Sequence, residues 1–231
     1  MNVGRLRYIV FSGIDGSGKT TKALFTQSFL SILNIKSMYV WFRWNAYISY
    51  FVLFIAKIIK LTIKVNINNQ LVIIRRYYTN KLLAYLWTLA QLMDFIIAHI
   101  FSSLRAKLYG ARIIIYDRFA IPDKIVDLIH ESRINLFKIT LARALIYHFL
   151  SKLRNGSMLI IFNKISPDKV LRMRKDLPSI NYPYVYDRLY TIILKIISGS
   201  NNMLILDSGK PLNENLLSIA RTLSMLLHHE D

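Results

Sequence analysis

The chain has 231 residues, of which 54% are hydrophobic, so it can bury a sizeable core and is not a disordered chain. It carries 31 lysines and arginines against 13 aspartates and glutamates, a net charge of +18 that favours phosphates, nucleic acid or anionic lipid as partners. The absence of cysteine excludes disulfides, thiolate zinc sites and cysteine nucleophiles, and it fits a cytoplasmic setting. The composition therefore names a class of partner, but not an activity.

The first residues do not form a signal peptide, because Arg5 and Arg7 are followed by only four apolar residues before the glycines begin. We therefore expect no leader. The most apolar segment, residues 46–63, contains Lys57 and Lys60, and its uncharged part is shorter than the ~20 residues that a membrane span needs. This segment is predicted to be a helix and not a span.

Short β-branched and aromatic runs alternate with longer segments of helical spacing. This alternation predicts an α/β fold with a mainly parallel sheet covered by helices on both faces, in a single domain over residues 1–231 with a helical insertion at about 46–75. The strands are expected at 6–11, 37–42, 112–116, 158–162 and 203–206. The helices are expected at 19–33, 46–64, 75–108, 121–153, 183–197 and 212–227.

A glycine-rich segment follows the first predicted strand and opens the first predicted helix. It matches G-x-x-x-x-G-K-[ST], in which the glycines let backbone N–H groups surround phosphate oxygens. Lys19 would neutralise the terminal phosphates, and the Thr20 hydroxyl would hold Mg²⁺. The candidate ATP-binding residues are Gly13, Ile14, Asp15, Gly16, Ser17, Gly18, Lys19, Thr20 and Thr21.

Three further polar residues extend this candidate site. Asp15 is expected to face away from the nucleotide phosphates, either towards a second ligand such as a sugar hydroxyl or in an Asx turn. Asp117 and Arg118 follow the third predicted strand, so they would emerge beside the glycine-rich segment. Asp117 is then a candidate Mg²⁺ ligand and Arg118 a candidate clamp for the acceptor's phosphate, although the alternative is a surface salt bridge of little energetic value.

Residues 11–21, FSGIDGSGKTT, resemble the F-x-G-x-D-G-x-G-K-T-T opening of thymidylate kinases. Asp117-Arg118-Phe119 resembles the D-R-Y/H motif of that family. Ser166-Pro167-Asp168, with Arg172 and Arg174, is similar to the start of the family's arginine-bearing lid. Residues 184–190 are similar to the helix after the lid, and residues 206–208 to the loop that borders adenine.

The resemblance implies a P-loop kinase sheet of five parallel strands in the order 2-3-1-4-5, with a lid at about 166–182. It implies transfer of the γ-phosphoryl group of ATP to dTMP in the presence of Mg²⁺, by a homodimer packed through long helices. It also implies roles for residues of this chain. Lys19 would stabilise the β- and γ-phosphates, Thr20 and Asp117 would serve the metal, and Asp15 would approach the acceptor sugar. Phosphate contacts would come from Arg43, Arg118, Arg172 and Arg174.

The acceptor side departs from the family pattern. Family members carry F-R-E-P where this chain has Phe42-Arg43-Trp44-Asn45. Asp94 and its neighbours stand where the family has a substrate-phosphate arginine, and Asp127 stands where the family has a base-reading glutamine. Arg75 and Arg76 could replace the lost contact, but we prefer to interpret them as solvated charges. The alternative function is therefore a P-loop kinase with a different phosphorylated or hydroxylated acceptor.

The predicted helix at 46–64 carries lysines on one side of an apolar surface, a pattern typical of an interfacial helix on anionic lipid. We prefer the simpler interpretation, in which the helix packs on the sheet with its lysines in water. A third hypothesis is a membrane-associated or nucleic-acid-associated NTP-binding module. No specific nucleic-acid motif occurs, and the histidines lack the spacing of a metal site.

Overall fold

The computed structural model describes residues 6–42, 46–67, 70–174, 177, 179–199 and 202–227, with only the backbone described at 62–75 and at 120. Five strands form one parallel sheet in the order β2-β5-β1-β6-β7. When these five strands are numbered along the chain, the order is 2-3-1-4-5, so the predicted order is confirmed. The strands are β1 (Tyr8–Ser12), β2 (Ser37–Trp41), β5 (Ile113–Asp117), β6 (Met158–Lys164) and β7 (Met203–Asp207).

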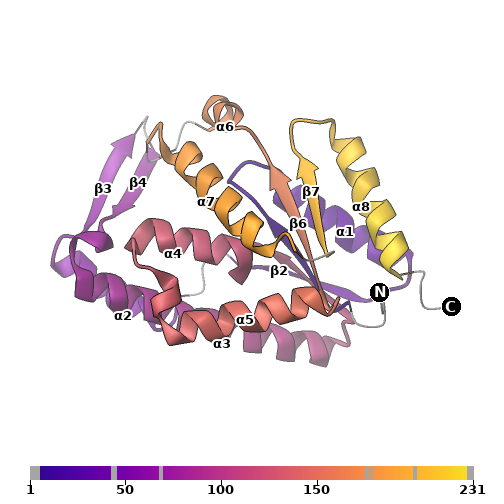
Figure 1. The fold of residues 1–231 in the computed structure, drawn as a ribbon, viewed down its shortest axis with the longest axis horizontal. Helices are drawn as coiled ribbons and strands as arrows, with labels where there is room; N and C mark the ends of the chain where they lie inside the picture. Colours follow the sequence, from indigo (N-terminus) through magenta and orange to yellow (C-terminus); the bar gives the residue numbers. More distant parts are fainter. Residues whose placement is uncertain are drawn as a thin grey trace.

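Helices cover both faces of the sheet, which confirms the predicted α/β class (Figure 1). The two faces divide along β1, because Ile9 and Phe11 pack against one helical layer while Val10 packs against the other. The first layer consists of α1 (Lys19–Ile32) and α8 (Leu212–Leu227). The second contains α3 (Lys81–Tyr109), α4 (Ile125–Ser132), α5 (Thr140–Arg154) and α7 (Tyr182–Ile197).

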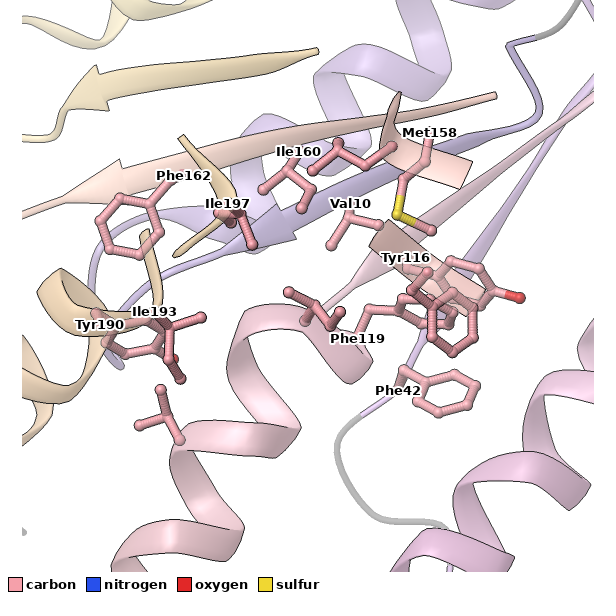
Figure 2. Packing of buried hydrophobic residues seen from close by; sticks show 14 of the residues in the cluster. Val10, Phe42, Tyr116, Phe119, Met158, Ile160, Phe162, Tyr190, Ile193 and Ile197 are labelled. Carbon is pink, nitrogen blue, oxygen red and sulfur yellow. The ribbon is translucent and has the colours of Figure 1, made fainter. Parts of the chain in front are cut away.

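An aromatic cluster fixes the segment that leaves β5. Phe119 stacks on Tyr116 with 4.1 Å between ring centroids, and it meets Phe42 edge-on at 5.4 Å (Figure 2). The Phe119 side chain is 1% exposed, and the backbone of the preceding residue, Arg118, has φ +69. The buried ring thus anchors the turn that presents Asp117 and Arg118 at the end of the strand.

The insertion between β2 and α3 is not purely helical, and the predicted helix at 46–64 is wrong in extent. Helix α2 covers only Ser49–Ile58, and an antiparallel hairpin of β3 (Thr62–Ile67) and β4 (Gln70–Arg75) follows it. Lys60 has φ 56, a left-handed conformation that cannot continue a helix. The β-branched residues of the next segment favour strands.

Two other helix boundaries differ from the sequence prediction. The predicted helix at 75–108 begins later, with a 3-10 turn η2 (Tyr77–Thr79) and then α3, whose first turn is capped by the Asn80 side chain. The predicted helix at 121–153 is divided into η3 (Ala120–Lys124), α4, η4 (Leu136–Lys138) and α5. The division occurs where Arg133 adopts φ 55 and Asn135 accepts a hydrogen bond from the backbone of Phe137.

Helix α6 (Pro167–Met173) lies in the predicted lid segment, between β6 and α7. Its first turn is capped by the Ser166 hydroxyl, and Pro167 occupies the first turn, where a missing N–H costs nothing. Among the described residues, α3 alone is long and apolar enough to cross a membrane. However, 56% of its most apolar window is buried inside the fold.

Candidate functional site

The candidate site lies at the carboxyl ends of the parallel strands, where open α/β sheets bind ligands. The glycine-rich loop, residues 13–18, connects β1 to α1, and Asp117 and Arg118 end β5. The first part of the loop lies against Asn163 of β6, and Ser208 after β7 contacts Ser17. The structure therefore brings together the two motifs that the sequence placed at neighbouring strand ends.

The glycines of this loop adopt positive φ angles, and at Gly13 the surroundings also exclude a side chain. Gly13 has φ +134, and a Cβ atom added there would lie 2.4 Å from the backbone oxygen of Asn163. Gly18, with φ +77, is the N-cap of α1, and it has no side chain that could cap the N–H groups of the first helical turn. Such N–H groups at the positive end of the helix dipole form an anion-binding site.

The remaining loop residues take different environments. Ile14 and Ser17 are buried, so they contribute to the loop mainly through the backbone, whereas Gly16, Thr20 and Thr21 are exposed. The Ser17 N–H donates to the Ile14 oxygen at 3.2 Å, which closes a turn inside the loop.

Two lysines of α1 point at the loop. Lys19 is 5% exposed, and its ammonium donates to the carbonyl oxygens of Gly13 and Ile14 at 2.7 and 2.8 Å. Lys22 donates to the Ser17 oxygen and to the Ser208 hydroxyl, both at 3.1 Å. Burial and the charge of Lys19 lower the pKa of Lys22 to about 8. Sequence reasoning missed Lys22, although its position one helical turn after Lys19 was visible.

A hydroxyl and a carboxylate meet at the start of α1. The Thr20 hydroxyl donates to Asp117 Oδ2 at 2.5 Å, and the Tyr39 hydroxyl donates to the same oxygen at 3.0 Å. Burial and the charge of Asp117 raise the pKa of Tyr39, so its hydroxyl stays protonated and acts as a donor. Magnesium prefers hard oxygen ligands and binds through one or two protein oxygens together with phosphates and water. Thr20 and Asp117 fit that donor set.

Two of the predicted arginines converge on Asp15. Arg118 forms an ion pair with Asp15, and Arg174 Nη1 lies 3.9 Å from the other carboxylate oxygen. Asp15 therefore takes part in an ion-pair cluster across the loop. Arg172 is exposed on α6 and stays outside that cluster. Arg43 lies outside the described residues.

Arg118 is 9% exposed and lies among acidic groups. Its burial opposes the charged form, but Asp123 and Asp127 outweigh this effect, and the pKa of the guanidinium is raised. The positive φ of Arg118 is a strained conformation for a residue with a side chain. A strained, buried arginine beside the N-terminus of a helix is typical of a functional site.

Helix α7 is linked to the segment after β5 by a tyrosine–carboxylate ladder, formed by Tyr190 with Asp123 and by Tyr186 with Asp127. The hydroxyl-to-carboxylate distances are 2.8 and 3.0 Å. The Tyr190 hydroxyl also lies 3.2 Å from the Gly13 oxygen, and Asp123 Oδ1 accepts from the Gly13 N–H at 3.3 Å. The four-residue spacing on both elements is the sequence signal that could have revealed this ladder.

The two acidic departures from the family pattern have structural partners. Asp94, which is 1% exposed, accepts hydrogen bonds from the backbone N–H groups of Ile48 at 2.6 Å and Ser49 at 3.0 Å. It thus caps the N-terminus of α2 from a neighbouring helix. Asp127 is half-buried and bonded to Tyr186, and burial raises its pKa against the opposing charge of Arg118.

Comparison with known proteins adds no assignment to this site. No family model matches the chain, and no curated protein matches it. The function must therefore be inferred from the geometry.

Proposed function

We propose that the protein transfers the γ-phosphoryl group of ATP to the phosphate of a nucleoside monophosphate, in the manner of a thymidylate kinase in the cytoplasm. The observation that carries the proposal is the contact between the Thr20 hydroxyl and Asp117, directly beside a loop whose N–H groups and Lys19 ammonium suit phosphate. A glycine-rich turn that binds no nucleotide would not need a hydroxyl and a carboxylate suited to Mg²⁺ at the start of the following helix.

In this proposal the loop holds the donor. The first-turn N–H groups of α1 would bind the β-phosphate oxygens, and Lys19 would leave the Gly13 and Ile14 oxygens to reach the terminal phosphates. Thr20 and Asp117 would hold Mg²⁺ directly or through water, and the bound ion would neutralise charge on the β- and γ-oxygens.

The arginines serve the acceptor. In the structure Asp15 neutralises Arg118 and Arg174, so an incoming phosphate would compete with a carboxylate for guanidinium groups already oriented towards the loop. An acceptor phosphate oxygen then attacks the γ-phosphorus, and the bond to the β–γ bridging oxygen breaks. That oxygen keeps the electron pair and leaves on ADP. Lys19 and the two arginines lower the cost of the charge on the transferring group.

The identity of the acceptor rests on the resemblance, which names dTMP. Two observations favour the alternative, a different phosphorylated or hydroxylated acceptor. Asp94 is occupied in capping α2, and Asp127 is bonded to Tyr186, so neither performs the family's phosphate-holding or base-reading task. Purified protein should therefore be assayed for ADP release with dTMP, dUMP, UMP, CMP, AMP and GMP.

Lys19→Ala is the background control for this panel, because it removes the ammonium from the loop without adding bulk. We expect acceptor-dependent ADP release by the wild type and a loss of at least about a hundredfold in the variant. Equal rates in the two proteins would remove the glycine-rich loop from the mechanism. Nucleotide binding without turnover on any acceptor of the panel would contradict the nucleoside monophosphate proposal.

A matched pair of arginine variants tests the acceptor side. Arg118→Gln should lower kcat/KM for the acceptor by at least about tenfold, because Arg118 is buried and paired with Asp15. Arg172→Gln should change it less than about threefold, because Arg172 is an exposed residue of α6. Equal losses in both variants would mean that the Asp15 cluster is not the acceptor-phosphate site.

A further inference from the structure

The surface charge of the first half of the chain is strongly one-sided. Asp94 is the only acidic residue between positions 16 and 116, a span that contains thirteen lysines and arginines. Its carboxylate is 1% exposed and capped onto the N-terminus of α2, so it does not offset this charge at the surface. A partner for this half of the molecule must therefore be anionic or uncharged.

Helix α2 presents apolar side chains to solvent, contrary to our expectation that it packs on the sheet. Its buried residues are Ser49, Val52 and Ala56, and it packs against α3 through Leu83, Trp87 and Ala90. The opposite face carries Tyr50, Phe51, Phe54 and Ile58, whose exposed fractions are 67%, 71%, 61% and 64%. We call these four residues the α2 apolar face. Such a contiguous exposed apolar surface marks an interaction site.

Basic residues gather at the carboxyl-terminal end of α2. Lys57 and Lys60 are exposed there. Arg76 and Lys81 are also exposed, and the Arg76 N–H donates to the oxygen of Leu61, just beyond α2, at 2.9 Å. An apolar helix face with a cationic end is the arrangement of helices that lie in the interface of anionic membranes.

We propose that the α2 apolar face docks on the surface of an anionic lipid bilayer, with Lys57, Lys60, Arg76 and Lys81 at the headgroups. The large aliphatic and aromatic side chains require an apolar layer, which a bilayer offers and a nucleic acid does not. A second copy of the chain that docked through the same face would bring Lys57 and Lys60 of both copies together, and the sequence from position 16 to 93 contains no acidic residue to neutralise them. The inference does not depend on the proposed phosphoryl transfer.

Co-sedimentation with vesicles tests the docking. Full-length protein is mixed with phosphatidylcholine vesicles, or with vesicles that also contain phosphatidylglycerol, at low and at high salt. We expect binding to the anionic vesicles at low salt, with a large decrease at high salt and on neutral vesicles. Equal binding to both vesicle types, or none to the anionic ones, would overturn the proposal.

Matched variants locate the surface. Phe51→Ser/Phe54→Ser should reduce the partition coefficient at least about tenfold. Lys57→Gln/Lys60→Gln should reduce it about 25-fold, at about fivefold per basic residue. Ile192→Ser/Ile196→Ser on α7 is the control, because those side chains are 49% and 50% exposed on another helix. It should bind as the wild type does. Thermal unfolding of each variant establishes that it is folded.

Two results would assign the surface to another partner. In the first, the wild type binds no vesicles and is a dimer in sedimentation equilibrium, and Phe51→Ser/Phe54→Ser dissociates that dimer. The α2 apolar face would then be an interface with a second copy of the chain. In the second, the wild type binds no vesicles but binds an RNA or DNA oligonucleotide in a salt-sensitive way, and the same variant weakens that binding. The α2 apolar face would then be a nucleic-acid-binding surface. Either result would overturn the membrane proposal.

Discussion

The glycine at position 13 is expected to be required for a steric reason, which a pair of alanine variants can test. Comparing the stability lost in Gly13→Ala with that lost in Gly156→Ala distinguishes a clash with the backbone from the ordinary cost of a positive φ. Both glycines have a positive φ, +134 at Gly13 and +81 at Gly156. An added Cβ at Gly156 meets nothing within 4 Å, so alanine there costs only the left-handed conformation, about 1–2 kcal/mol. An added Cβ at Gly13 would lie 2.4 Å from the Asn163 backbone oxygen, which cannot rotate away as a side chain would.

The strain of the less accessible φ and the displacement of β6 each add about 1–3 kcal/mol at Gly13, so we expect a total loss near 4 kcal/mol. For a chain of 231 residues, 1 kcal/mol changes Tm by about 2–4 °C. Gly13→Ala should then lower Tm by about 8–16 °C, and Gly156→Ala by about 2–8 °C. Urea unfolding measures the free energies directly. Equal losses in the two variants would refute the argument that the close approach of β1 and β6 requires glycine.

The remaining predictions concern two ionisable groups of α3, the buried Asp94 and the half-buried His99. Asp94→Asn should lower the free energy of unfolding in urea by about 2 kcal/mol, because the amide nitrogen that replaces one carboxylate oxygen cannot accept a hydrogen bond from its α2 N–H group. Asp168→Asn, at an exposed position of α6, should lower it by less than about 0.5 kcal/mol. Equal losses of unfolding free energy in the two variants would contradict the capping role of Asp94. Burial, with the charge of Lys152, lowers the pKa of His99 to about 4 from about 6.5 in the unfolded chain. The unfolded state therefore binds more protons below pH 6.5, and the His99 contribution to stability falls by about 2 kcal/mol between pH 7.5 and pH 5. His99→Gln should remove that part of the acid sensitivity, and an unchanged pH dependence of the unfolding free energy would contradict the assignment.

The parallel sheet could be predicted because its information is local. Each buried strand is a short β-branched run, and the glycine-rich segment predicts the turn into α1. The position of Asp117 and Arg118 beside that loop followed from the rule that strand ends meet at one edge of a sheet. Thr20 and Asp117, which were both expected to serve the metal, are bonded to each other, whereas the ion pair between Asp15 and Arg118 was not predicted.

The contacts that the sequence did not reveal depend on distant pairs. Nothing near Asp94 indicates that its carboxylate caps a helix 45 residues earlier, and nothing near Tyr190 indicates contact with Gly13, 177 residues away. The β3–β4 hairpin was mistaken for helix because the apolar run before it continues into it without a glycine or proline. The solvent-facing side of α2 contradicts the assumption that apolar residues on a helix face the core.

The tyrosine–carboxylate ladder has a mechanical consequence. Tyr190 pins the middle of α7 to the base of the glycine-rich loop, whereas the beginning of α7, at Tyr182, lies eight residues towards α6. Tyr186, halfway between these two positions, is bonded to Asp127, so α7 is held at two points that lie about 6 Å apart along its axis. Two such anchors oppose a tilt of the helix about either one of them. A displacement of the glycine-rich loop would therefore be transmitted to the whole of α7.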